Sequence, residues 1–534
     1  MFRALGVAVA AVCVVVRVRG VVAFGPTDFD DAYMFLRYAH HLRGGQGLVW
    51  NAGEAAVFGV TSPAYLLLLT ALQALAPSFE DGRLLQIASC GLGLAAVPLL
   101  AFTCARFSRH PRLHGNFGLW LAMLFPLVAL SEAFEFHVRS GMDTTLSLVA
   151  NALVIQAGLA FAERPTPRAA VLAALASFAA VLARPDNLLV AELCPLLLLW
   201  RSGGKRSSAR LFAGVFTALV LLALALARWR LGTALPLAFH AKQPGAYRGF
   251  VGEYTWNPYL FLEVFLKAAL PFVAVLLVLV DRARWRLAAP LLLPVLLTFP
   301  FYFWVNQIMG HLGRFYFPFL PYFAVSAALV ADDALIHRSL RAFRVLAAAL
   351  AIVAGGPLLE AAGRRYQARA RGQQLASLGG YSVPAAAPLP ELDSWQSSLE
   401  IARLAATAPP GTVFAMSEHG LVGARAPTAT IVDVLGLHDR VFALQGFSAA
   451  ELWRRRPDAL WMPHPDHTQM LRDILDSDEL WADYDFFPDA FTYGVALRRD
   501  GPAVLRAHFD ERWKAVYATR LADDYKARRQ APQP

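Results

Sequence analysis

Long stretches of apolar residues without charges recur along this 534-residue chain and constrain its fold more than any other feature. A straight helix needs about 20 such residues to cross a bilayer. With 57% hydrophobic and 16% charged residues, the chain is unlike a disordered segment or an ordinary soluble enzyme. The pattern predicts a polytopic α-helical membrane protein with about eleven transmembrane helices. The apolar runs lie at about 4–24, 84–104, 117–130, 144–162, 169–183, 188–200, 211–228, 263–280, 287–304, 315–331 and 345–359.

The distribution of Lys and Arg predicts how these helices are oriented, because cytoplasmic loops are enriched in both residues. A shorter apolar run at 64–76 follows Pro63 and ends at Pro77. If this run is a re-entrant or juxtamembrane helix, about sixteen cations collect in short loops on one side of the membrane and about eight in longer loops on the other. This arrangement predicts a cytoplasmic N-terminus and an extracytoplasmic tail from residue 360. The net charge of +10 then reports topology, and no nucleic-acid partner is expected.

Cysteine and histidine spacing predicts neither a disulfide framework nor a zinc site. His464 and His467 form an H-x-x-H pair, but Pro465 prevents the regular helix that would bring the two rings together. A metal site is therefore not expected at this pair. All four cysteines fall within predicted membrane spans: Cys13, Cys90, Cys104 and Cys194.

The first predicted outer loop, residues 25–82, has the densest polar signal in the chain. Thr27 or Asp28 can cap a following helix. Asp30, Arg37 and His41 fall on one side of that helix, so we expect an amphipathic helix that lies along the membrane interface. The opposite side is an apolar stripe of Ala32, Phe35, Leu36, Ala39 and Leu42.

Two adjacent carboxylates, Asp30 and Asp31, are expected at the outer membrane surface. An enzyme whose co-substrate has a tail in lipid needs such a group to deprotonate a hydroxyl, although capping and the helix dipole explain acidic residues in a first turn equally well. Polar clusters in the other outer loops indicate either a shared cavity for an anionic ligand or solvated loop residues. These clusters contain Glu132, Glu135, His137, Arg139, Asp143, Arg184, Asp186, Arg230, His240, Lys242, Arg248, Asn306, Gln307, His311 and Arg314.

From about residue 360 the composition becomes mixed and polar. Short β-like runs at 412–417 and 430–435, and helical patterns near 395–407, 448–456 and 467–476, predict a small α/β domain. Its aromatic residues are expected to form the core of this domain more than to bind sugar rings. We therefore divide the chain into a transmembrane domain, 1–359, and an extracytoplasmic domain, 360–534.

Several motifs occur in a characteristic order along the chain. Residues 30–39 read DDAYMFLRYA, 45–54 read GQGLVWNAGE, 61–63 read TSP, 140–143 read SGMD, 184–186 read RPD and 235–242 read LPLAFHAK. In the tail, 418–420 read EHG and 431–439 read IVDVLGLHD. This series resembles that of bacterial GT-C membrane glycosyltransferases, which include protein mannosyltransferase-like enzymes and actinobacterial arabinofuranosyltransferases. The resemblance spans almost the whole length of the chain.

The resemblance implies an inverting glycosyltransferase of the bacterial inner (cytoplasmic) membrane, acting in cell-wall or other glycan biosynthesis. Its donor would be a polyprenyl-phosphate sugar, and its acceptor an extracytoplasmic glycan or glycoprotein. By motif position, Asp30 is the catalytic base and Asp31 its partner. Substrate-binding residues would be Arg37, Tyr38, Asp143, Arg184, His240, Lys242, His311 and Arg314.

Some features of the expected reaction stay open. No cofactor is required by the resemblance, and a role for a divalent cation is undetermined. Leu237 and Ala238 replace the usual Asn-Thr of the L-P-N-T-F pattern, and Val60 replaces the Tyr before T-S-P. These departures leave the donor sugar open.

Two other functions are compatible with the same charges. A transporter or flippase for a lipid-linked sugar would bind the headgroup without chemistry, and a non-catalytic membrane scaffold would use its tail to bind a partner. The charges lie in outer loops, without the repeat-paired helix breaks at the midplane that alternating access uses. This placement argues against the transporter.

Overall fold

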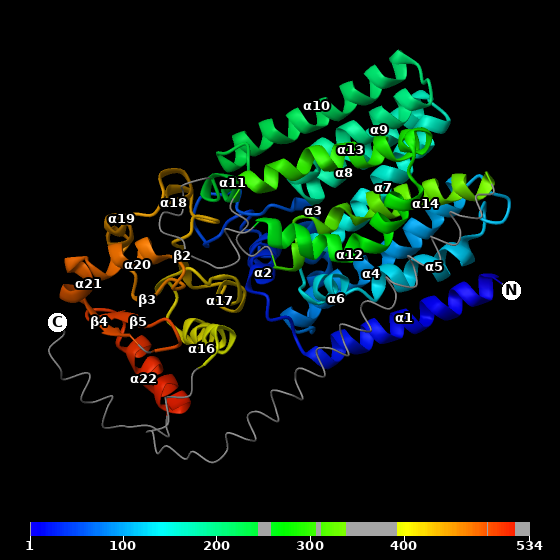
Figure 1. Cartoon of the computed structure of the whole chain (residues 1–534). Coiled ribbons are helices and arrows are strands. Elements are labelled where there is room, and N and C mark those ends of the chain that lie inside the picture. The colour runs from blue at the N-terminus through cyan, green and yellow to red at the C-terminus, as the bar shows by residue number, and fades with distance from the viewer. Residues whose placement is uncertain (1, 244–257, 306–310, 338–391, 489, 518–534) are drawn as a thin grey trace, which may run out of the picture.

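The computed structural model describes residues 2–243, 258–305, 311–337, 392–488 and 490–517. A helical bundle forms the N-terminal part, and an α/β domain lies at one end of it (Figure 1). The helices of the bundle are α1 (Phe2–Phe24), α4 (Asp81–Phe107), α5 (Phe117–Ala129), α6 (Glu132–Arg139), α7 (Thr144–Glu163), α8 (Pro167–Ala183), α9 (Leu188–Arg201), α10 (Arg206–Leu231), α12 (Pro258–Leu279), α13 (Arg282–Trp304) and α14 (Leu320–Ile336). The elements in the connecting segments are α2 (Asp30–Arg43), α3 (Pro63–Leu75), α11 (Leu237–Ala241) and the 3-10 turns η1 (Pro185–Asn187), η2 (His311–Gly313) and η3 (Phe317–Phe319).

Seven described helices are long and apolar enough to cross a membrane, and the pair α5 and α6, bent by 79°, would be an eighth. The polytopic helical class is thus confirmed, and the described residues contain fewer helices of this length than the eleven expected spans. The expected spans at 169–183 and 188–200 are α8 and α9, which have only 17 and 14 residues. They are short because Pro185 disfavours helical geometry at Arg184, which is extended (φ −161°, ψ 129°). The run at 64–76 is the short helix α3, and the run at 345–359 lies outside the described residues.

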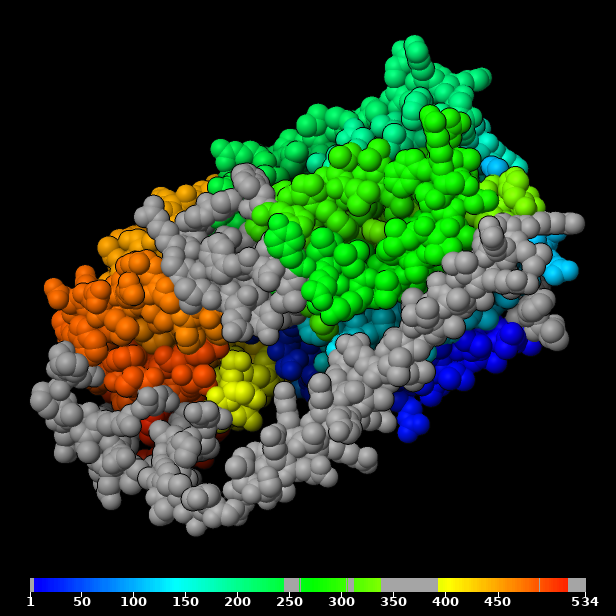
Figure 2. Space-filling view, viewed as in Figure 1, coloured from blue at the N-terminus to red at the C-terminus, as the bar shows by residue number. Residues whose placement is uncertain are grey.

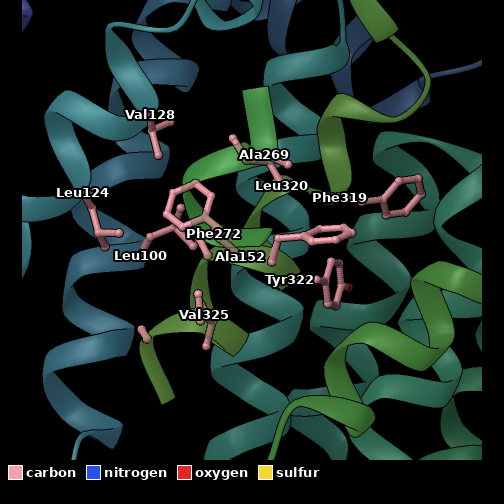
Figure 3. Packing of buried hydrophobic residues seen from close by; sticks show 14 of the residues in the cluster. Leu100, Leu124, Val128, Ala152, Ala269, Phe272, Phe319, Leu320, Tyr322 and Val325 are labelled. Atoms are coloured by element: carbon pink, nitrogen blue, oxygen red, sulfur yellow. The ribbon is translucent and has the colours of Figure 1, made fainter. Parts of the chain in front are cut away.

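One large apolar core holds the bundle together. In Figure 3, Leu124, Phe272 and Val325 point into the same space from three different helices. The core also includes Leu320 at the start of α14. Burial of apolar surface stabilises the fold by about 25 cal/mol per Å². The packed core therefore holds the helices in place, and with them the helix ends from which the polar loops begin.

The C-terminal part is a small α/β domain. Its sheet has the strand order β2-β1-β3-β5-β4, in which β1 pairs in parallel with β2 and β3, and β5 pairs antiparallel with β3 and β4. The strands are β1 (Val413–Met416), β2 (Thr430–Asp433), β3 (Ala459–Trp461), β4 (Tyr484–Phe487) and β5 (Val495–Arg498). The helices are α16 (Ser394–Thr407), α17 (Gly420–Arg425), α18 (Arg440–Gln445), α19 (Ala449–Arg454), α20 (Thr468–Leu475), α21 (Asp478–Asp483) and α22 (Ala503–Tyr517).

This domain confirms the expected α/β tail. The β-like runs at 412–417 and 430–435 are β1 and β2, and the three helical patterns are α16, α19 and α20. The boundary expected at 359/360 lies outside the described residues. Figure 2 shows the yellow to red atoms of this domain packed at one end of the blue to green bundle.

Helix α2 is enclosed on both sides, so the expectation that it presents its polar side at the membrane surface is wrong. Its apolar stripe is buried as predicted, but Arg37 and His41 are only 0% and 3% exposed. The C-terminal domain covers this polar side, and one continuous apolar core includes both Leu36 of α2 and Leu421 of α17. The expected cap is also wrong: Phe29 is the N-cap residue of α2, and no side chain caps the helix.

Candidate active site

A cavity of about 540 Å³ opens where α2, α11, the η1 turn and the C-terminal domain meet. This volume is within the range of pockets that bind small ligands. Apolar side chains such as Met34, Phe35 and Phe239 make up much of its wall. The polar lining residues are Asp31, Thr61, Arg184, Asp186, His240, Lys242, Gln243, Tyr302, Arg314 and His438.

An ion pair between Asp31 and Arg314 is part of the polar lining. The Nη1 atom of Arg314 donates to the Asp31 Oδ2 atom at 2.9 Å, and the two side chains are 9% and 15% exposed. Burial alone would raise the pKa of Asp31, but Arg314 and Lys242 hold it below its ordinary value. Asp31 is therefore an ionised acceptor at neutral pH. The turn η2, in which Leu312 and Gly313 have positive φ values of 48° and 70°, immediately precedes Arg314 in the chain.

Arg184 forms a second ion-pair network in the wall of the cavity. Its Nε and Nη2 atoms donate to both carboxylate oxygens of Asp186, at 3.1 and 2.6 Å. The Asp143 carboxylate lies 3.6 Å from Arg184 Nη1, and the Tyr302 hydroxyl donates to Asp186 at 2.8 Å. The carboxylates raise the pKa of Arg184 although burial opposes this. Two carboxylates neutralise this guanidinium, so the network is better suited to shaping the wall than to supplying a free cation.

Lys242 follows helix α11 and lines the cavity together with His240. Burial lowers the pKa of Lys242 to about 8, although the nearby Asp31 favours the charged ammonium. The residue thus changes charge close to physiological pH. The His311 side chain lies outside the described part of the structure.

Asp30 and Asp31 have different surroundings. Of the described residues, Asp31 lines the cavity and Asp30 does not. The two carboxylate oxygens of Asp30 accept hydrogen bonds from the backbone N–H groups of Gly420 and Leu421, both at 2.8 Å. Burial raises the pKa of Asp30, even though His419 and the two amides favour the ionised form. Asp30 thus joins α2 to the start of α17 in the C-terminal domain.

Arg37 also connects α2 to the C-terminal domain and is not among the residues that line the cavity. Its guanidinium donates to the backbone carbonyls of Gly423 (2.8 Å), Ala426 (3.0 Å) and Ala429 (2.8 Å). Two further bonds go to the Trp50 carbonyl (2.6 Å) and the Asn51 side chain (2.9 Å). Because these bonds use all five donors of the fork, Arg37 is engaged in docking and has none left for a phosphate.

Tyr38 is buried beside the cavity, and its hydroxyl lies 3.1 Å from the Nδ1 atom of His438. Tyr38 does not line the cavity itself but holds the cavity residue His438 in position. The structure thus gathers Asp31, Arg184, Lys242 and other predicted residues around one cavity, while Arg37 and Tyr38 support it.

Several cavity residues were not singled out from the sequence as site residues, among them Asp186, Tyr302 and His438. Asp186 belongs to the quoted RPD motif, and its charge next to Arg184 was a usable signal. Tyr302 lies in an apolar run where an aromatic residue carries no such signal. His438 comes from the C-terminal domain, and only the fold brings it beside α2.

No family model matches the chain, and no curated protein matches it by sequence. Among solved structures it is similar to the archaeal oligosaccharyltransferase AglB from Archaeoglobus fulgidus, in complex with an inhibitory peptide and a dolichol-phosphate. The TM-score is 0.51 at 12% sequence identity, and the match covers 93% of this chain and 75% of that chain. At this identity the comparison establishes the fold. The chain has the GT-C-like fold of a polytopic membrane glycosyltransferase, as the sequence motifs predicted.

Proposed function

We propose that this protein is an inverting glycosyltransferase that moves a sugar from a polyprenyl-phosphate donor to an extracytoplasmic glycan or glycoprotein. The observation that carries the proposal is the Asp31–Arg314 pair beside Lys242 in one cavity. An ionised carboxylate next to two cations suits a reaction in which a hydroxyl loses a proton and a phosphate leaves. The similarity of the fold to an oligosaccharyltransferase solved with a dolichol-phosphate supports a lipid-phosphate donor.

In the proposed reaction, the Asp31 carboxylate accepts the proton of the acceptor hydroxyl. The hydroxyl oxygen then forms a bond to the anomeric carbon from the face opposite the donor phosphate. The bond between that carbon and the phosphate oxygen breaks, and its electron pair stays on the phosphate. Arg314 and Lys242 are fixed cations that would stabilise the developing phosphate charge.

The different environments of the two aspartates favour Asp31 over Asp30 as the base. Asp31 faces the cavity with its charge stabilised by Arg314, whereas both oxygens of Asp30 are occupied by the amides of Gly420 and Leu421. We assign Asp30 as a positioning residue, which places α2 and the neighbouring Asp31 against the C-terminal domain.

The release of polyprenyl phosphate from native lipid-linked sugars tests this assignment without knowledge of the sugar. Asp31→Asn should lower the rate by about 10²–10⁴-fold, as expected for loss of a general base. Binding of polyprenyl phosphate itself should persist or tighten, because Arg314 loses its carboxylate partner. Asp28→Asn, at an exposed position, is the matched control and should retain the wild-type rate.

The same assay separates the roles of the two aspartates. Asp30→Asn should lower the thermal stability, since asparagine keeps one acceptor oxygen and presents its NH2 group to the second of the two backbone N–H donors, Gly420 or Leu421. An Asp31→Asn protein with full release activity would refute Asp31 as the base. If Asp30→Asn instead abolished release without changing stability, the base would be Asp30. Lipid-linked sugar crossing the membrane without polyprenyl phosphate release would favour a flippase.

A further inference from the structure

Three potential metal ligands meet where the first outer loop contacts the C-terminal domain. They are His419, at the N-cap of α17, Asp433, at the end of β2, and His438, five residues further on. One ligand atom from each residue lies within 4.8 Å of the other two. The three residues are only 0–3% exposed. Two imidazoles and one carboxylate are ligands that zinc and related divalent metals prefer.

The hydrogen bonding of His419 leaves one ring nitrogen available. Its Nδ1 atom lies 2.7 Å from the Ser417 carbonyl oxygen, which can only accept, so Nδ1 carries the proton. Within the described part of the structure, the buried Nε2 atom has no hydrogen-bond partner. An imidazole held by a backbone carbonyl through one nitrogen, with the other free, is the usual arrangement of a metal-binding histidine.

The other two ligands are held in place by their neighbours. The Asp433 carboxylate accepts from the backbone N–H groups of Leu435 (2.9 Å) and His438 (2.6 Å), and its Oδ1 atom lies 3.6 Å from His419 Nδ1. The His438 ring stacks on Trp50 with a centroid distance of 4.0 Å and an interplanar angle of 12°.

The two nitrogens of His438 have weak or adaptable partners. Nδ1 lies 3.1 Å from the Tyr38 hydroxyl, which can donate or accept, and Nε2 lies 2.9 Å from the Met34 sulfur. Neither contact ties up the ring with a charged group. Residues of the first loop thus surround a ligand that belongs to the C-terminal domain.

We propose that His419, Asp433 and His438 form a binding site for a divalent transition metal of the zinc class. In a tetrahedral zinc site with bonds of about 2.0–2.1 Å, the ligand atoms lie about 3.3 Å from one another. The ligand atoms of these three residues, which lie within 4.8 Å of one another, must therefore approach by up to about 1.5 Å. His438 also lines the cavity, so the metal would lie beside the proposed reaction site. It would hold together the two segments, at α17 and after β2, that contact Asp30 and Tyr38.

Metal content tests the proposal independently of sugar transfer. The full-length protein, purified in detergent with an affinity tag that lacks histidine, is loaded with Zn²⁺, desalted and analysed by elemental mass spectrometry. We expect about one zinc per chain. Loss of a metal ligand, or of a residue that holds a ligand in place, weakens metal binding at least about 10-fold. We expect this effect for each of three substitutions: His419→Gln, Asp433→Asn and His438→Gln. His464→Gln, in the same domain and outside the cluster, should bind zinc like the wild type.

Two further measurements keep the test decisive if a variant fails to fold. Wild-type protein loaded with Co²⁺ should show the visible absorption of a low-symmetry site, and a chelator should remove that absorption and lower the unfolding temperature. Less than about 0.1 zinc per chain in the wild type would refute the site. Equal zinc binding by wild type, His419→Gln and His438→Gln would refute it as well. A wild-type protein that binds zinc but transfers no sugar would contradict only the proposed glycosyltransferase activity and not the metal site.

Discussion

Lys242 gives the proposed donor site a pH dependence. Burial places the pKa of its ammonium at about 8, so the side chain is charged below this pH and neutral above it. A neutral amine cannot stabilise the donor phosphate, and kcat/KM for the donor should therefore fall about tenfold per pH unit above pH 8. Lys242→Arg should shift this fall to higher pH, because a guanidinium stays charged. The measurement is the pH profile of polyprenyl phosphate release.

Glu418 provides the control for this prediction. Burial, together with Asp30 and Asp31, raises its pKa to about 8 as well, so it is a second source of a titration in the same range. Glu418→Gln should leave the alkaline fall in place if Lys242 causes it. A fall that disappears in Glu418→Gln and persists in Lys242→Arg would contradict the assignment.

Individual residues show where sequence reasoning succeeds and fails. The charge pattern placed Arg184, Lys242 and Arg314 on one side of the membrane, and the fold gathers them around one cavity. Arg37 has the same charge and a strong motif, yet it binds carbonyls of residues 423–429, far along the chain. Only the tertiary structure identifies the partners of a buried cation.

At the scale of elements, the contact between α2 and α17 positions the site. Gly420 allows this contact, because a Cβ atom at this position would lie 2.0 Å from the Asp30 carbonyl oxygen. Gly420→Ala should therefore displace α17 and cost about 1–3 kcal/mol, which lowers the unfolding temperature by several degrees. Gly91→Ala is the control, because a Cβ there meets nothing within 4 Å. Equal unfolding temperatures for Gly420→Ala and the wild type would show that α17 does not need this close approach.

The existence of most elements was predictable, but their lengths and neighbours were not. Apolar runs and period-2 stretches identified the bundle helices and the strands β1 and β2, since these signals are local. The helices α8 and α9 proved short because a single Arg184–Pro185 turn joins them. Helix α2 looked amphipathic, yet the C-terminal domain buries its polar side. Coverage by a distant domain leaves no periodic signal in the covered helix.

At the scale of the whole molecule, the fold separates the charged residues of the cavity from the basic residues of the turn between α9 and α10. The C-terminal domain and the cavity residues lie at one end of the bundle, and the N-terminus and the turn between α9 and α10 lie at the other (Figure 1). Lys205 and Arg206 belong to this second end, which the positive-inside rule assigns to the cytoplasm. The cavity would then face the extracytoplasmic side.

Single-cysteine labelling tests this orientation without removal of native residues. The native cysteines are all buried and should react slowly, whereas Lys205 and Asp500 are exposed. On intact cells, a membrane-impermeant maleimide should label Asp500→Cys and should label Lys205→Cys only after permeabilisation. The reverse pattern would place the cavity in the cytoplasm, where a donor delivered to the outer face could not reach Asp31. Labelling of both sites before permeabilisation would contradict a bundle that separates them across the membrane.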